Sequence, residues 1–298
     1  MSTKRHGDDT RRWALRDSIA TFRYTNRQGN LLPNKGVGVA EYLERTTDMT
    51  TTRPKIKTQK TFRRVRAVAG GDTIADSTKV LMVWEKKFYP TFFFPMDDVR
   101  LDLMTATDEV DHSPRKGDAQ LYDLTVGEEL RKAAARVYHE SPVEELVGYV
   151  ALRWDAMDAW YEEDEEMFVH ARDPFTRIDI LQSSRNIRVE IDGVTVADSN
   201  MPKVLLETGL PRRFYLPQTD VRMDLLTPTD LHTACPYKGV ANYWNVTIDG
   251  NVHENVVWGY PFPTLESAKI AGYVAFWDEK LDIYVDGVLQ DKPKTVFS

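Results

Sequence analysis

The residues with the clearest capacity for chemistry in this sequence are its single cysteine and a nearby lysine. Cys235 and Lys238 lie three positions apart in the segment Ala-Cys-Pro-Tyr-Lys-Gly. A cysteine close to an ammonium group can have a lowered pKa, and its thiolate can then act as a nucleophile. Free cysteine also packs well as a small hydrophobic side chain in a turn, so this alternative stays open.

Lys238 and Glu207 form a second candidate pair. A lysine before a tight turn can hold a carboxylate or a phosphate as a point charge. Glu207 follows the apolar residues of Val-Leu-Leu-Glu, and a buried glutamate needs a partner because a lone buried charge is costly. We expect either a purely structural ion pair or a pair that lines a pocket, where Lys238 holds an anionic group and Glu207 is the general acid or base. Asp198 is another acidic partner for the lysine, and we assign it to substrate binding.

Aromatic residues are dense around this segment. Trp258 and Tyr260 lie in Trp-Gly-Tyr-Pro-Phe-Pro, which is typical of a loop, where large aromatic side chains often face a ligand. Core filling explains the same residues equally well. We assign Tyr215, Tyr237, Trp258 and Tyr260 to substrate binding.

Other kinds of site have little support. The six histidines show no HxxxH or HxH spacing, and one cysteine cannot build a multi-cysteine zinc site. Gly36-Val37-Gly38 lacks the third glycine of a dinucleotide site, and no GxxxxGK[ST] loop occurs. We expect no metal and no cofactor.

An internal repeat defines the domains that must position these residues. A shift of 122 positions aligns Ala75-Asp76-Ser77 with Ala197-Asp198-Ser199, and Lys116-Gly117 with Lys238-Gly239. The same shift pairs Glu85 with Glu207. We therefore expect a first, divergent repeat domain at 61–172 and a second repeat domain at 173–298, after an N-terminal extension and linker at 1–60.

The N-terminal extension is basic, with 13 Lys and Arg against 6 Asp and Glu, whereas the whole chain has a formal net charge of −7. A basic arm can bind nucleic acid, but the acidic remainder of the chain is the simpler partner, so we expect no nucleic-acid partner. No apolar run approaches the ~18 residues of a membrane span, and the N-terminus lacks a signal-peptide core. We expect a cytoplasmic protein that does not bind membranes, and its oligomeric state stays open.

Period-two alternation dominates both repeats and predicts short antiparallel strands. Ile187–Ile191, Asp192-Gly193 and Val194–Val196 predict a β-hairpin, and 273–277 with 281–285 predicts a last hairpin. Helix is expected only at 264–270, 126–138 and 11–22. The predicted fold class is mainly β, with two homologous antiparallel domains, little helix and an N-terminal extension.

The second repeat resembles a known family. It contains Ala-Asp-Ser, a downstream Glu, Cys-Pro-Tyr-Lys-Gly, Trp-Gly-Tyr-Pro-Phe-Pro, Gly-Tyr-Val-Ala-Phe-Trp and a closing Val-Asp-Gly. This order is similar to the domain of unknown function 427, here in tandem. The resemblance implies a β-tent-like fold, as in methionine sulfoxide reductase B and the thalidomide-binding domain of cereblon, in a zinc-free version. The first repeat departs from the pattern at Ser113 and around Tyr138.

These observations predict a protein that binds a small-molecule ligand in a pocket of the second repeat domain and acts on it as an enzyme. A non-catalytic ligand-binding or protein-interaction module is the alternative. The sequence does not identify the substrate or the reaction.

Overall fold

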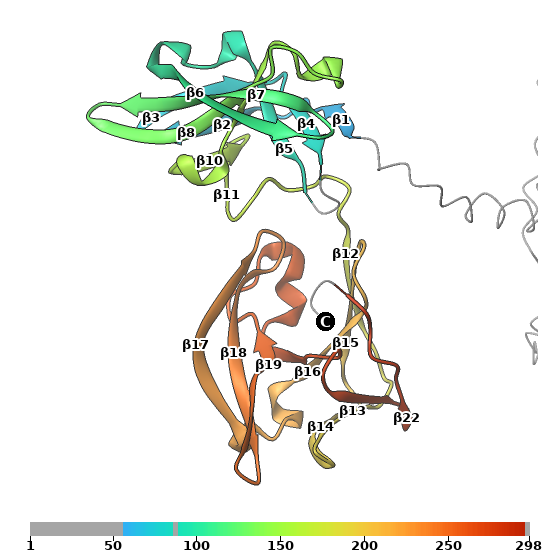
Figure 1. Cartoon of the computed structure of the whole chain (residues 1–298). Coiled ribbons are helices and arrows are strands. Elements are labelled where there is room, and N and C mark those ends of the chain that lie inside the picture. The colour runs from blue at the N-terminus through green and yellow to red at the C-terminus, as the bar shows by residue number, and fades with distance from the viewer. Residues whose placement is uncertain (1–55, 86–88, 296–298) are drawn as a thin grey trace, which may run out of the picture. The chain divides into compact units, whose positions relative to one another are not determined.

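Two repeats of one antiparallel β architecture make up the described part of the chain, which covers residues 56–85 and 89–295 of this computed structural model (Figure 1). Each repeat has a seven-stranded and a four-stranded sheet. The strands of the first repeat are β1 (Lys57–Lys60), β2 (Val65–Ala69), β3 (Asp72–Ser77), β4 (Leu81–Trp84), β5 (Thr91–Pro95), β6 (Met104–Ser113), β7 (Gly117–Val126), β8 (Glu129–Val137), β9 (Tyr149–Leu152), β10 (Ala159–Glu162) and β11 (Glu165–Met167).

The second repeat has the same strands in the same chain order. They are β12 (Ile178–Gln182), β13 (Ile187–Ile191), β14 (Val194–Ser199), β15 (Lys203–Glu207), β16 (Arg213–Pro217), β17 (Leu226–Cys235), β18 (Gly239–Ile248), β19 (Asn251–Gly259), β20 (Tyr273–Phe276), β21 (Asp282–Val285) and β22 (Val288–Leu289). Its larger sheet has the order β12-β15-β16-β20-β19-β18-β17, and its smaller sheet β14-β13-β21-β22. The first repeat has the equivalent orders, β1-β4-β5-β9-β8-β7-β6 and β11-β10-β2-β3.

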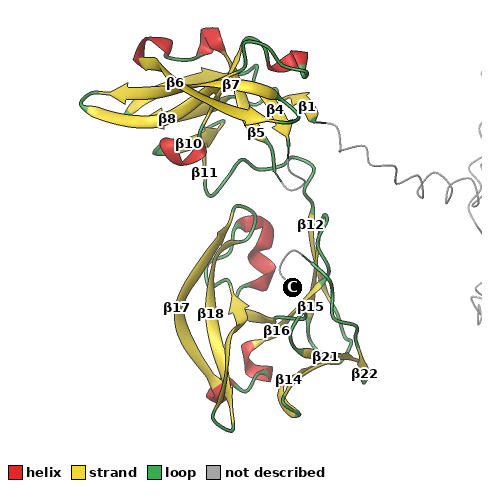
Figure 2. Cartoon of the chain, in the orientation of Figure 1, coloured by secondary structure: helices red, strands yellow, loops and turns green. Residues whose placement is uncertain are grey.

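Helical structure in the described residues is confined to short 3-10 segments between strands (Figure 2). They are Met96–Asp98, Leu101–Leu103, Glu144–Leu146, Trp154–Ala156, Gln218–Asp220, Met223–Leu225 and Leu265–Ile270. The predicted fold class, mainly β with two similar antiparallel domains and little helix, is confirmed for the described residues.

The larger sheet of each repeat separates two hydrophobic clusters. In β16, Phe214 and Leu216 belong to the main core, which also contains Val189 of β13 and Ile283 of β21. Tyr215, between them in sequence, belongs to a smaller cluster on the other face of the sheet. This division follows from the period of two in a strand, which sends successive side chains to opposite faces.

Two local predictions were wrong. Residues 126–138 were expected to be helical, but Glu129–Val137 forms β8, which pairs with β7 and β9. Pairing on both sides outweighs the helix propensity of its alanines. The segments 273–277 and 281–285 were expected to form one hairpin, but β20 lies in the larger sheet and β21 in the smaller one.

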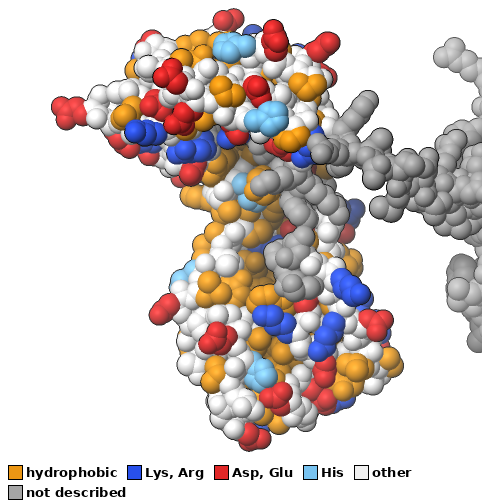
Figure 3. Space-filling view, viewed as in Figure 1, with side chains coloured by type: hydrophobic (Ala, Val, Ile, Leu, Met, Phe, Trp, Pro, Cys, Tyr) orange, Lys and Arg blue, Asp and Glu red, His pale blue; other side chains and the backbone are white. Residues whose placement is uncertain are grey.

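At the N-terminal side, Lys57–Lys60 forms the edge strand β1, paired with β4, where the sequence predicted an extended linker. The expected helix at 11–22 and most of the basic extension lie outside the described residues. Acidic and basic side chains are interspersed over the face shown in Figure 3, in keeping with the surface ion pairs Arg100–Asp102 and Arg222–Asp224.

Candidate functional site

Lys238 and Glu207 form an enclosed ion pair in the second repeat. The Nζ atom of Lys238 donates to Oε2 of Glu207, and the two side chains are 11% and 10% exposed. Glu207 ends β15, and Lys238 lies in the turn between β17 and β18, where its backbone N–H donates to the carbonyl of Cys235 at 3.3 Å. The pairing expected from the sequence is therefore present.

This contact requires a strongly curled sheet. The strands β15 and β18 are four positions apart in the order of the larger sheet. Neighbouring strands are about 4.8 Å apart, so a flat sheet would separate these two strands by about 19 Å. A lysine side chain cannot cover that distance, so the sheet must close toward itself. The ion pair joins the two sides of the curl, and the smaller hydrophobic cluster lies between them.

Three of the predicted site residues belong to the smaller hydrophobic cluster or pack against it. We call this cluster, inside the curl of the larger sheet, the inner cluster. Tyr215 is 1% exposed and Tyr260 is 7% exposed, while Trp258 packs against the cluster. The indole N–H of Trp258 donates to the hydroxyl of Tyr215 at 3.2 Å. Burial raises the pKa of Tyr215 and of Tyr260 well above the ordinary value of tyrosine. Both hydroxyls therefore stay protonated at neutral pH and can donate hydrogen bonds.

Cys235 is at the same end of the curl. It ends β17, faces Gly239 of β18 in the register, and is partly exposed. Burial is the largest cause of the raised pKa of Tyr260, and the electrostatic effects of the nearby Tyr215 and Cys235 side chains add to it. The structure thus brings Lys238, Glu207, Tyr215, Trp258, Tyr260 and Cys235 into one neighbourhood.

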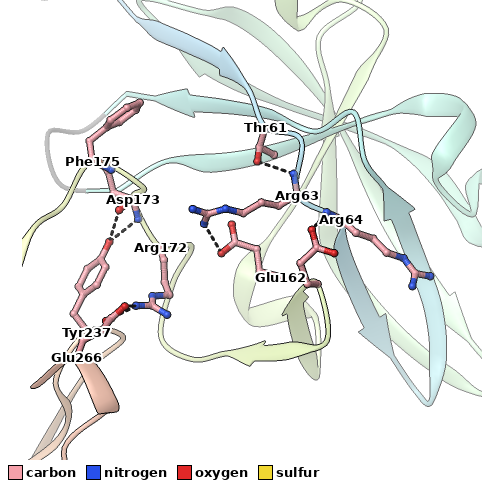
Figure 4. A network of polar contacts seen from close by, with 10 residues as sticks. Thr61, Arg63, Arg64, Glu162, Arg172, Asp173, Phe175, Tyr237 and Glu266 are labelled. Carbon is pink, nitrogen blue, oxygen red and sulfur yellow. Dashed lines mark hydrogen bonds and ion pairs between the residues drawn. The ribbon is translucent and has the colours of Figure 1, made fainter. Parts of the chain in front are cut away.

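Tyr237 points away from this neighbourhood. Its hydroxyl accepts a hydrogen bond from the backbone N–H of Asp173 at 2.5 Å, and the adjacent Arg172 pairs with Glu266 (Figure 4). Its own carbonyl accepts the hydroxyl of Ser267 at 2.9 Å. Tyr237 therefore anchors the connecting segment rather than the Lys238–Glu207 pair.

Asp198 also lies elsewhere. It belongs to β14 of the smaller sheet, and its Oδ1 accepts a hydrogen bond from Nδ2 of Asn186 at 2.6 Å, at the surface. The equivalent Asp76 pairs with Arg64. The repeated Ala-Asp-Ser motif therefore holds the edge of the smaller sheet and contributes no group to the inner cluster.

The sequence prediction missed Arg213, which lies beside the cluster, and the two acidic residues that pair with it. Arg213 at the start of β16 pairs with Glu279 at 2.5 Å and Asp278 at 3.3 Å, and its guanidinium lies 5.7 Å from the ring centre of Trp258. Burial raises the pKa of Asp278 to about 6. Arg213 stands two residues before Tyr215, and this period-two spacing is the signal that could have placed it on the inner face.

The first repeat keeps part of this site. Lys116 pairs with Glu85, and Ser113, in the position of Cys235, donates to Glu85 Oε1 at 3.1 Å. Tyr138 occupies the position of Tyr260 and is fully buried. Phe93 and Arg136 stand where the second repeat has Tyr215 and Trp258, so the first repeat has fewer hydroxyl and indole donors.

Within the described ranges, no group of three or more His, Cys, Asp or Glu side chains is arranged to hold a metal ion. In that same part of the chain, no helix has the length and apolar character needed to cross a membrane.

The fold is that of a tandem, mainly β protein in which each half contains an equivalent Lys–Glu ion pair. Comparison with protein families gives two matches to a single family, described as a domain of unknown function (DUF427), over residues 57–163 and 179–287. These matches cover more than half of the chain, which therefore belongs to this family as a tandem of two copies. No curated protein matches the chain.

Proposed function

We propose that the second repeat binds a small organic molecule with an anionic group at its inner cluster and catalyses a reaction of that molecule. The observation that carries the proposal is the enclosed pair of Lys238 and Glu207 beside two buried tyrosines and the cysteine. Ionisable groups that converge in a poorly solvated space are typical of functional sites.

In this proposal the ligand replaces Glu207 as the partner of Lys238. A carboxylate or phosphate on the ligand takes the ammonium group, and the carboxylate of Glu207 is then free to accept a proton from the bound molecule. The hydroxyls of Tyr215 and Tyr260 act as hydrogen-bond donors. Cys235, at the end of β17, serves as the nucleophile if the reaction has a covalent step.

Binding without catalysis is the second candidate, favoured by a separate observation. Phe262 is 89% exposed and Leu265 is 96% exposed, and both lie in the segment that follows Tyr260. Large apolar side chains in such positions are common at protein–protein contacts. A partner protein on these two residues would make the second repeat an interaction module. Under either candidate, the proposed location is the cytoplasm, and nucleic acid is not a proposed partner.

The test compares equivalent lysines in the two repeats. The full chain and the variants Lys238→Gln and Lys116→Gln are incubated with a collection of carboxylate- and phosphate-bearing metabolites, and the melting temperature and product formation are measured. The proposal predicts a compound that stabilises the wild type and Lys116→Gln, but not Lys238→Gln, and that is converted by the first two only. Circular dichroism checks that both variants fold. Equal responses of Lys238→Gln and the wild type would contradict the proposed role of Lys238.

A further inference from the structure

A pocket of about 350 Å³ lies in the second repeat on the opposite face of β15 from Glu207. Its lining includes Leu206, the neighbour of Glu207 in the strand, together with Phe214, Leu281 and Ile283. The last three belong to the main core between the two sheets, and Phe214 and Ile283 are 7% and 5% exposed. The pocket is therefore an opening at the edge of the main core and does not include the Lys238–Glu207 pair.

Asp278 is one of the charged residues that line this pocket, and it competes with Glu279 for one arginine. Arg213 donates to both carboxylate oxygens of Glu279, at 2.8 and 2.5 Å. Its contact with Asp278 is longer, at 3.3 Å. The side chains of Arg213, Asp278 and Glu279 are 13%, 14% and 1% exposed, so one positive and two negative charges are enclosed together.

The remaining charged groups of the pocket leave this imbalance in place. Arg212 lines the pocket, but its guanidinium donates to Gln290 at 2.7 Å and lies 5.3 Å from the ring centre of Phe214. Asp291, also in the lining, carries one negative charge, equal and opposite to the charge of Arg212. An excess negative charge therefore remains at Asp278, where burial disfavours the carboxylate.

We infer that this pocket is a second binding site, for a small organic cation whose ammonium group pairs with Asp278 and whose apolar body packs on Leu206, Phe214, Leu281 and Ile283. An ammonium group would supply the positive charge that the cluster lacks. The volume is at the lower end of the ~300–1,000 Å³ that is usual for small-molecule pockets. This site goes beyond the proposed function, since it lies on the other face of the sheet and takes the opposite charge.

Benzylamine is a suitable probe, with benzyl alcohol and benzoate as neutral and anionic molecules of the same shape. Isothermal titration calorimetry of the full chain at pH 7.5 should show binding of benzylamine and no binding of the other two. Asp278→Asn should weaken benzylamine roughly tenfold or more, because it removes a charged hydrogen-bonding partner. Asp282→Asn is the matched control: Asp282 pairs with Lys292 at the surface and should leave the affinity unchanged.

A second variant separates loss of the site from loss of folding. Leu206 is 42% exposed, so Leu206→Trp can fill the pocket without altering any charge, and it should abolish benzylamine binding in a folded protein. Lys238→Gln should bind benzylamine as the wild type does, which separates this site from the proposed anion site. Equal binding of benzylamine and benzyl alcohol, or full affinity in Asp278→Asn or Leu206→Trp, would overturn the inference.

Discussion

Lys238 of the turn before β18 pairs with Glu207 at the end of β15, across the interior of a curled sheet. Lys116 and Glu85 make the same contact in the first repeat, although the residues around them differ. A contact that bridges strands four positions apart holds the sheet in its curled form. The pair therefore has a structural task in both repeats, and any ligand chemistry in the second repeat builds on it.

Removal of Lys238 should destabilise the second repeat. Lys238→Met leaves the carboxylate of Glu207 enclosed without its partner, and breaking a buried pair in this way costs about 3–5 kcal/mol of unfolding free energy. The double variant Lys238→Met/Glu207→Leu should recover most of this loss, because it removes both charges. Urea unfolding followed by tryptophan fluorescence measures both changes.

The first repeat offers the matched comparison for this prediction. Glu85 is 33% exposed, whereas Glu207 is 10% exposed. In Lys116→Met, water can therefore solvate the unpaired carboxylate of Glu85 better than it can solvate Glu207 in Lys238→Met. The decrease in unfolding free energy should be smaller for Lys116→Met than for Lys238→Met. A larger loss in the first repeat would show that exposure of the carboxylate does not control the cost.

Strand periodicity and the internal repeat were sufficient to predict most of the fold. The alternation in Ile187–Ile191 predicted β13, and the structure buries Ile187, Val189 and Ile191 at 0%, 1% and 3% exposure. The alanines of Glu129–Val137 misled the prediction, because the decisive factor is pairing with β7 and β9, which are formed by residues outside that segment. Local propensity carries no information about such partners.

The candidate site was predictable only in part, for a related reason. The need of a buried carboxylate for a cation predicted the contact of Glu207 with Lys238. Nothing in the spacing of Tyr237 shows that its hydroxyl turns toward Asp173, or that Asp198 binds Asn186 in the other sheet. The directions of the Tyr237 and Asp198 side chains depend on how the neighbouring strands are distributed between the two sheets. A single sequence does not specify that distribution.

Asp278 should make the protein more stable at low pH than at neutral pH, whereas most carboxylates in folded proteins have the opposite effect. Its pKa is raised from 3.8 to about 6 in the folded protein, mainly by burial, so the folded state binds the proton more tightly than the unfolded state. The resulting stabilisation is fully present below about pH 4 and is lost as the pH rises through 6.

The variant Asp278→Asn isolates this contribution. The unfolding free energy of the wild type relative to Asp278→Asn should increase by up to about 3 kcal/mol between pH 7 and pH 4, because a shift of one pKa unit corresponds to about 1.4 kcal/mol. Chemical denaturation at a series of pH values measures the difference. A difference that stays constant, or that decreases toward pH 4, would contradict the raised pKa.

Gly239 should not tolerate a side chain. It adopts φ +99°, and a Cβ atom there would lie 2.9 Å from the carbonyl oxygen of Phe262. Gly239→Ala therefore adds a backbone clash to the ordinary cost of a left-handed residue, which is about 1–2 kcal/mol. Gly250→Ala is the control, because Gly250 has φ +85° with no atom within 4 Å of the added Cβ. Thermal unfolding should show the larger loss for Gly239→Ala, and equal losses would mean that the turn moves away from Phe262 without cost.

The buried hydroxyl of Tyr138 should lower the unfolding free energy of the protein relative to a phenylalanine at the same position. It is fully buried and has no hydrogen-bond partner among the described residues, whereas the hydroxyl of Tyr215 accepts the indole N–H of Trp258 at 3.2 Å. An unsatisfied buried polar group costs about 1–3 kcal/mol, so Tyr138→Phe should raise the unfolding free energy. Tyr215→Phe should lower it, because the indole N–H then loses its acceptor. Urea unfolding of the two variants gives both signs, and a loss of stability in Tyr138→Phe would mean that a bound water or a ligand satisfies this hydroxyl in solution.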